Sequence, residues 1–174
     1  IKMLVTDGAG AGAAVTDVLD MTGGTGNVGL GSGALGTSIT TGTDNVAIGD
    51  SAGDAITTGT RNSLLGDNSG GAITTGTQNT FVGRDAAAAN TTASSNTFIG
   101  ERAGLTNTTG DLSVAVGQYS LALNTTGANN VAIGRSTLSA NTTADNNTAV
   151  GYQSMNANTT GANNVALGAL SLDA

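Results

Sequence analysis

The pentapeptide Asn130-Val131-Ala132-Ile133-Gly134 decides the fold, because versions of it recur at a fixed interval along most of the chain. The glycines equivalent to Gly134, here called anchor glycines, follow one another every 17 residues after a first step of 18: Gly31, Gly49, Gly66, Gly83, Gly100, Gly117, Gly134, Gly151 and Gly168. Four residues before each stands an asparagine, except where Ser113 replaces it, and Thr-Thr pairs run in the same phase. So strict a period predicts a repeat architecture in which each unit stacks on the next.

Composition favours the same architecture. The 174 residues include 28 glycines, no Pro, Cys, His or Trp, and only two Phe and two Tyr. A solenoid needs only a few small inward-facing residues in each coil, so this supply is sufficient. The net charge of −7 and the five basic residues argue against nucleic-acid binding. No apolar run approaches the roughly 20 residues of a membrane span, and without cysteine there are no disulfides and no thiol or zinc-thiolate sites.

We expect two segments. Residues 1–26 precede the repeat and read as a short strand, Ile1 to Thr6, followed by a glycine-rich stretch that caps or links the repeat domain. A dinucleotide-binding glycine loop is the weaker interpretation there, because no room remains for the helix that it requires. Residues 27–174 form the repeat domain.

Within each coil, the residues around the anchor glycine alternate as in a strand. The position just before the glycine is always aliphatic, so we predict that it forms one buried core column: Leu30, Ile48, Leu65, Val82, Ile99, Val116, Ile133, Val150 and Leu167. A second short extended segment and two turns complete the 17 residues. The prediction is an all-β parallel β-roll or β-solenoid of nine coils, on the order of 40 Å long at about 4.8 Å per coil.

Core volume passes from one side of the coil to the other along the chain. Four residues after the anchor glycine, Gly53, Gly70, Ala87 and Gly104 give way to Leu121, Leu138, Met155 and Leu172. Just before the Thr-Thr pair, Ile39, Ile56 and Ile73 give way to Asn90, Asn107, Asn124, Asn141 and Asn158. This exchange is what volume-conserving packing requires. We expect the thinnest coil around Ala86 to Ala89.

Stacking in register also predicts polar ladders. Asparagines one period apart can hydrogen-bond amide to amide along the axis, which we favour over glycosylation for the five Asn-Thr-Thr sites from Asn90 to Asn158. Asp67, Arg84 and Glu101 stack in the same way, and Asp44 lies one coil from Arg61.

Two groups of residues are predicted interfaces. Leu64, Phe81 and Phe98 occupy, in consecutive coils, the position on the face opposite the proposed core column, and a stripe of large apolar side chains there would mark a contact surface. Ile1, Met3 and Val5 form an apolar strand that either pairs with the open last coil of a neighbouring subunit or folds back on its own first coil.

The repeated Asn-Asn-Val-Ala-Ile-Gly of residues 129–134 and Asn-Asn-Val-Ala-Leu-Gly of residues 163–168 resembles the head repeats of trimeric autotransporter adhesins (YadA-like heads) and similar repeats in phage tail fibres. The resemblance covers residues 27–174. It implies a left-handed parallel β-roll, usually trimeric, that extends a fibre and carries adhesive surfaces at a cell surface or on a virion.

We therefore expect a non-enzymatic extracellular fibre or filament module, structural and adhesive, without a cofactor or metal. Its partner is another copy of itself, as a trimer or an end-to-end filament, with a cell-surface glycan or protein as ligand. The alternative is a tailspike-like protein that binds or depolymerises glycans, with Asp50, Asp54 and Asp67 as candidate carboxylates. An ice-binding solenoid is less favoured, because the Thr-x-Thr pattern of the first coils stops after three coils.

Overall fold

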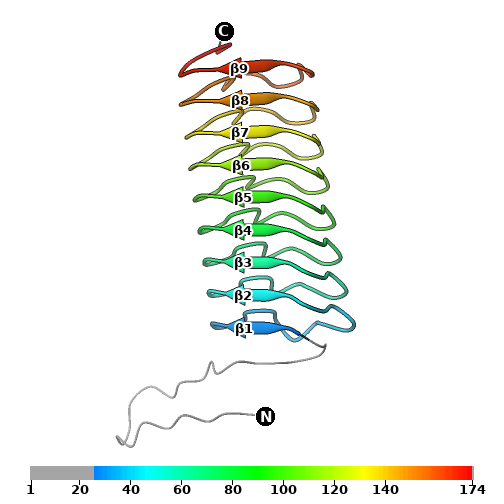
Figure 1. The fold of residues 1–174 in the computed structure, drawn as a ribbon. Coiled ribbons are helices and arrows are strands. Elements are labelled where there is room, and N and C mark those ends of the chain that lie inside the picture. The colour runs from blue at the N-terminus through cyan, green and yellow to red at the C-terminus, as the bar shows by residue number, and fades with distance from the viewer. Residues whose placement is uncertain (1–25, 174) are drawn as a thin grey trace, which may run out of the picture.

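The computed structural model describes residues 26–173 as a β-solenoid with one strand in each coil (Figure 1). Ile1, Met3, Val5 and nearly all of the proposed capping segment 1–26 lie outside the described residues. Nine three-residue strands form one parallel sheet in sequence order. They are β1 (Val28–Leu30), β2 (Val46–Ile48), β3 (Ser63–Leu65), β4 (Thr80–Val82), β5 (Thr97–Ile99), β6 (Val114–Val116), β7 (Val131–Ile133), β8 (Thr148–Val150) and β9 (Val165–Leu167). Coils are numbered here by their strands.

The sequence period is the register of the sheet. Each strand pairs in parallel with the equivalent residues of the next coil, as Val114 does with Val131 and Val116 with Ile133. The backbone hydrogen bonds therefore run from coil to coil, for example from the Val131 amide to the Asn147 carbonyl at 2.8 Å. No helix occurs in residues 26–173. The predicted parallel solenoid of 17-residue coils is confirmed.

The remainder of each coil is made of tight turns. The second extended segment that we expected does not form a strand in any described coil. Instead, the chain bends through left-handed residues, such as Tyr119 at φ 58° and Leu121 at φ 52°. The anchor glycine is required by its backbone: Gly100 has φ 133°, and a Cβ there would lie 2.6 Å from the Gly117 carbonyl carbon. Stacking of one turn directly on the next thus excludes every side chain at that position.

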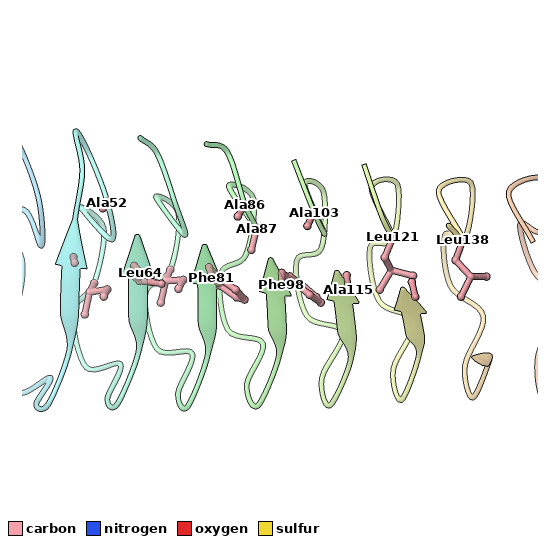
Figure 2. Packing of buried hydrophobic residues seen from close by; sticks show 14 of the residues in the cluster. Ala52, Leu64, Phe81, Ala86, Ala87, Phe98, Ala103, Ala115, Leu121 and Leu138 are labelled. Atoms are coloured by element: carbon pink, nitrogen blue, oxygen red, sulfur yellow. The ribbon is translucent and has the colours of Figure 1, made fainter. Parts of the chain in front are cut away.

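The core lies on the opposite face of the strands from the one predicted. The middle residue of each strand points inward, so Ala47, Leu64, Phe81, Phe98 and Ala115 are buried (Figure 2). The proposed core column was wrong. Leu30, Ile48, Leu65, Ile99, Ile133 and Leu167 are 38% to 79% exposed, and Val82, Val116 and Val150 are half-buried. The physical reason is that one strand backed by tight turns leaves a narrow interior, which cannot hold a large aliphatic side chain from every coil in addition to the turn residues.

The proposed contact stripe of Leu64, Phe81 and Phe98 was wrong for the same reason. All three side chains are at most 1% exposed. The rings of Phe81 and Phe98 stack inside the solenoid, with centroids 5.3 Å apart and planes 14° apart. Ala86 and Ala87 are buried in the same cluster as Phe81 and Phe98, so the coil that we expected to be the thinnest contains a large core residue, Phe81.

The exchange of core volume along the chain is confirmed, with the middle strand position as a third participant. Ile56, Ile73, Leu121, Leu138 and Met155 are all buried. Where the middle position is large, the turn opposite is small: a Cβ on Gly104 would collide with the Phe98 ring, and one on Gly70 would lie 3.1 Å from Phe81. From coil 6 onward alanine stands in the strand and a large residue in the turn.

Two amide ladders run through the interior. In the first, Asn62 donates to the Asn45 side-chain oxygen at 3.0 Å and to the Gly76 carbonyl at 2.9 Å. In the second, Asn124 donates to the Asn107 side-chain oxygen at 2.7 Å and to the Gly127 carbonyl at 2.9 Å. The predicted stacking of asparagines is therefore present. Because these amides satisfy both one another and the turn carbonyls, the polar groups that a narrow coil must bury are stabilised.

Candidate functional site

The outer sheet face, defined as the first and third residues of the nine strands, is the main apolar surface of the described chain. Its third-residue column is aliphatic in every coil, and its first-residue column holds Val, Thr or Ser. Strands β1 to β9 stack in sequence order over the whole height of the solenoid (Figure 1), so both columns run along its full length. The residues that the sequence marked as core are thus brought together as a continuous surface.

This face is a long, narrow strip that runs along the solenoid. At about 4.8 Å between strands and about 7 Å between the two columns, nine strands form a strip of roughly 40 Å by about 7 Å, on the order of 300 Å². Contiguous apolar patches of several hundred Å² on a single chain usually mark a contact surface. A flat row of β-branched and aliphatic side chains, with no polar atom between them in the third-residue column, is suited to pack against another apolar surface.

A polar ladder borders the face where the strands end. Arg84 forms an ion pair with Glu101, whose other carboxylate oxygen accepts from the Gln118 amide at 2.9 Å. Arg135 donates in turn to Gln118 at 3.2 Å and lies over the Tyr152 ring at 5.9 Å from its centroid. Hydrogen bonding from Arg84 and then Gln118 lowers the pKa of Glu101 below its usual value.

A second polar column lies one residue further along the turn. Arg102 contacts Asp85 at 3.5 Å, donates to the Tyr119 hydroxyl at 2.8 Å and lies over its ring. Asn68 donates to Asp85 at 2.9 Å. All these contacts join consecutive coils, so the two columns hold the coils in register.

The stacked charges predicted from the sequence are only partly paired. Arg84 and Glu101 form the expected contact, but Asp44 and Arg61 do not form an ion pair; Asp44 accepts from the Thr43 hydroxyl at 3.0 Å. Asp50, Asp54 and Asp67 are exposed on turns. Asp50 and Asp67 stack in one column, and Asp54 lies elsewhere on the coil. Among residues 26–173, no group of three or more acidic side chains is arranged to hold a metal ion.

The Thr-Thr pairs form two columns, one hydrogen-bonded to the next coil and one exposed. The first threonine of every pair but the last donates its hydroxyl to a carbonyl of the next coil, as Thr74 does to the Thr91 carbonyl at 3.1 Å. The second threonine is exposed in all eight coils that have one: Thr41, Thr58, Thr75, Thr92, Thr109, Thr126, Thr143 and Thr160. The neighbouring threonine column, two positions later, ends after Thr77, as noted from the sequence.

A hollow of about 330 Å³ lies at the last described coil, between Met155, Asn158, Asn164 and Leu172. Met155 and the two asparagines belong to the core and the amide ladders of the coils below. The hollow is therefore the interior of the solenoid seen at its uncovered end, and its lining has no separate chemistry.

No helix among the described residues has the length and apolarity that crossing a membrane would require. Comparisons of the chain with protein-family models, with curated proteins and with solved structures gave no match.

Proposed function

We propose that this chain is a structural module of an extracellular fibre, and that copies of it associate through the outer sheet face. The observation that carries the proposal is the unbroken aliphatic column of that face, which is exposed or half-buried in every strand. If the chain stayed monomeric, polar residues would be more soluble at these positions. The strip itself, on the order of 300 Å² from each copy, is smaller than the roughly 800 Å² share of a standard protein interface, so the contact would also include the turns that border the face. The resemblance to adhesin heads and tail fibres supports the extracellular setting and makes a trimer the expected assembly.

The proposed role is mechanical, with adhesion as its extension and no catalysis. The coil-to-coil ladders of backbone bonds, asparagines and charged side chains make a long repeat into a rod, which serves to hold other parts of a molecule at a distance. The exposed turns are the surface on which a cell-surface glycan or protein would bind. Incubation of the protein with capsular and cell-wall glycans, followed by analysis of chain length, tests the depolymerising alternative directly.

The decisive test is a triple variant of the outer sheet face, Ile48→Asp/Ile99→Asp/Ile133→Asp. These side chains are 38% to 40% exposed in the single chain, so the variant is expected to fold, with an unchanged circular dichroism spectrum. We expect the wild type to sediment as a multiple of its 16.7 kDa chain mass and the variant as a monomer, because three aspartates would place unpaired charges in the contact.

The matched control is Thr58→Asp/Thr92→Asp/Thr126→Asp, which adds the same charge to the exposed threonine column. It is expected to keep the wild-type mass. A wild type that remains monomeric at high concentration, or a triple face variant that still assembles, would contradict the proposal.

A further inference from the structure

The four arginines of residues 26–173 are held in three different ways. Arg84 and Arg102 each contact a carboxylate of a neighbouring coil, which neutralises their charge. Arg61 is exposed, and only its backbone amide is hydrogen-bonded. Arg135 makes two side-chain contacts, and neither is with an acid. Along its column the nearest acid, Glu101, lies two coils away and is itself paired with Arg84. Arg135 is thus the one described arginine that is held in place and not neutralised.

The two contacts of Arg135 fix its guanidinium group and leave one edge of it unused. Its Nε donates to the Gln118 side-chain oxygen at 3.2 Å, and its guanidinium carbon lies 5.9 Å from the centroid of the Tyr152 ring. Neither of its terminal Nη groups donates to a described residue. Two parallel N–H groups in one plane are the donor pattern that binds a carboxylate with two hydrogen bonds. Since the side chain is already ordered, binding an anion there costs less conformational entropy.

A second arginine–tyrosine pair has the same stacking, but an acid completes it. Arg102 lies over the Tyr119 ring at 5.7 Å from its centroid, donates to the Tyr119 hydroxyl at 2.8 Å and contacts the Asp85 carboxylate at 3.5 Å. Its charge is used within the chain, and Tyr119 is half-buried. Tyr152 is 45% exposed, and its hydroxyl is bonded to no described residue. Arg102 therefore joins coils, whereas Arg135 and Tyr152 present a cation and an aromatic ring to solvent.

The next residues along the two turns add a hydroxyl and an amide. Ser136 follows Arg135 and Gln153 follows Tyr152; both are half-buried, and neither side chain is bonded to a described residue. The four residues thus place unused hydrogen-bonding groups around an exposed ring within two consecutive coils, about 4.8 Å apart, which is comparable with the width of one sugar ring. Sugars present hydroxyls, which pair with amides and hydroxyls, and C–H groups, which pack on the negative face of an aromatic ring. Phosphopeptides are recognised by clusters of arginines, and this site has a single one.

We propose that these four residues, here called the acidic-sugar site, bind a glycan residue that carries a carboxylate, either a uronic acid or a sialic acid. The carboxylate accepts two hydrogen bonds from the Nη groups of Arg135. The sugar ring packs beside Tyr152, with Gln153 and Ser136 bonded to its hydroxyls. The inference rests on the adhesive part of the proposed function and does not depend on association of copies. A shallow site of this size binds weakly, with a Kd on the order of 1 mM, and association of several copies would raise the avidity.

Saturation-transfer NMR detects weak binding of this kind and shows which sugar protons contact the protein. The protein is diluted until it sediments as the single chain, so that association does not cover the site. The ligands are sialyllactose and a tetrasaccharide of alternating glucuronate and N-acetylglucosamine. Their controls, lactose and the tetrasaccharide with its carboxylates reduced to alcohols, lack the acid. We expect transfer to the ring protons of at least one acidic saccharide, about tenfold weaker binding of its control, and identification of the acid from the saccharide that binds.

Variants assign the binding to these residues. Arg135→Gln should weaken binding by about tenfold or more, because it removes the charged hydrogen bonds, and Arg135→Lys should weaken it less, since the charge remains without the planar fork. Tyr152→Ala should weaken binding by about threefold to tenfold, and Tyr152→Phe should keep it. The matched control is Arg61→Gln, the same change at another exposed arginine, which should bind as the wild type does. Because all these positions are exposed, the variants are expected to keep the wild-type circular dichroism spectrum.

Several results would overturn the acidic-sugar site. Equal binding of acidic and neutral saccharides, or equal losses in Arg135→Gln and Arg61→Gln, would show that Arg135 has no specific role. Acetate or sulfate that displaces the saccharide at equal concentration would show a site for any anion, and a phosphoserine peptide that binds more tightly would show a different class of ligand.

Failure of this site can be told apart from failure of the proposed self-contact. A wild type that stays monomeric at high concentration yet binds an acidic saccharide contradicts the self-contact and leaves the acidic-sugar site standing. A wild type that associates at high concentration but binds no acidic saccharide when dilute overturns the acidic-sugar site alone.

Discussion

Asn90 is the one residue whose buried amide has no hydrogen-bond partner among the described residues, although its side chain is fully buried. It is the first asparagine of the second amide ladder, and the residue below it, Ile73, offers neither donor nor acceptor. Its equivalents above it, such as Asn107 and Asn124, are all bonded. An unsatisfied buried amide costs about 1–3 kcal/mol, so the change from an apolar to a polar interior is destabilising at this coil.

We expect Asn90→Val to raise the free energy of unfolding by about 1–2 kcal/mol, because it removes the unsatisfied amide and extends the apolar column by one coil. Valine is preferable to isoleucine. In the coil below, the isoleucine at the equivalent position, Ile73, has room only because residue 70 is a glycine: a Cβ at Gly70 would lie 2.8 Å from Ile73 Cδ1. The residue equivalent to Gly70 in the coil of Asn90 is Ala87, whose Cβ would therefore crowd the Cδ1 of an isoleucine at position 90. Urea denaturation followed by circular dichroism measures the change.

The control is the same substitution within the bonded ladder, Asn124→Val. It removes the side-chain partner that Asn107 and Asn141 share and should lower stability by about 2–3 kcal/mol. Equal effects of the two substitutions would show that Asn90 is satisfied in solution.

Within a single coil, core volume is shared between the strand and the turn opposite. Coil 5 combines Phe98 with Gly104, whereas coil 6 combines Ala115 with Leu121. Both coils carry asparagine at the third core position, and both turn residues have nearly the same left-handed backbone, φ 59° at Gly104 and φ 52° at Leu121. The two solutions should therefore be interchangeable as pairs and not as single residues.

A double-mutant cycle tests this exchange. Phe98→Ala alone should cost about 3–5 kcal/mol through the cavity it leaves, and Gly104→Leu alone should cost about 1–3 kcal/mol through its collision with the Phe98 ring. The double variant reproduces coil 6 and should recover most of the loss, apart from about 1 kcal/mol of stacking with Phe81. Thermal melts of all four proteins provide the comparison, and simple additivity of the two losses would refute shared volume.

The same exchange explains why the sequence predicted the coil but not its inside. The period fixes register, strand positions and turn positions, because every coil must repeat one backbone. The strand alternates between two apolar faces, and neither periodicity nor β-propensity says which one is buried. The uniform aliphatic column of Ile99 and its equivalents favoured the wrong face. The informative signal was size: Phe98 is large where Gly104 has no side chain, and such matching occurs only between residues that touch.

The candidate site was missed through the same inversion. Residues such as Ile48 and Ile99 were named, but as core, so the exposed surface that they form was not recognised. The size of the mid-strand residue changes from coil to coil together with the size of the turn residues, and this correlation would have identified the mid-strand position as the interior. The other side of the strand would then have been recognised as the exposed surface.

At the scale of the whole molecule, each coil contacts only the coils on either side, so stability should be a sum of local terms. Removal of residues 135–151 joins Gly134 to Tyr152 and deletes one coil without changing the position of any other residue in its column. We expect the shortened chain to fold and its rod to be about 4.8 Å shorter, as measured by small-angle scattering. Removal of residues 135–152 leaves a 16-residue coil that cannot keep both its buried turn residue and its strand in place, and this variant should be markedly less stable or unfolded.

Since the bonds between coils point along the rod, tension applied to its ends would load every junction in series, and the weakest would set the breaking force. The junction between coils 4 and 5 lacks a link in the second amide ladder, because Asn90 makes no bond to Asn107. That same junction carries both ion pairs found in residues 26–173, Arg84–Glu101 and Asp85–Arg102, and the Phe81–Phe98 stack. The reinforcement thus lies at the mechanical weak point. Because exposed ion pairs are screened by dissolved ions, the tensile strength of the rod should depend on salt at this one junction and little elsewhere.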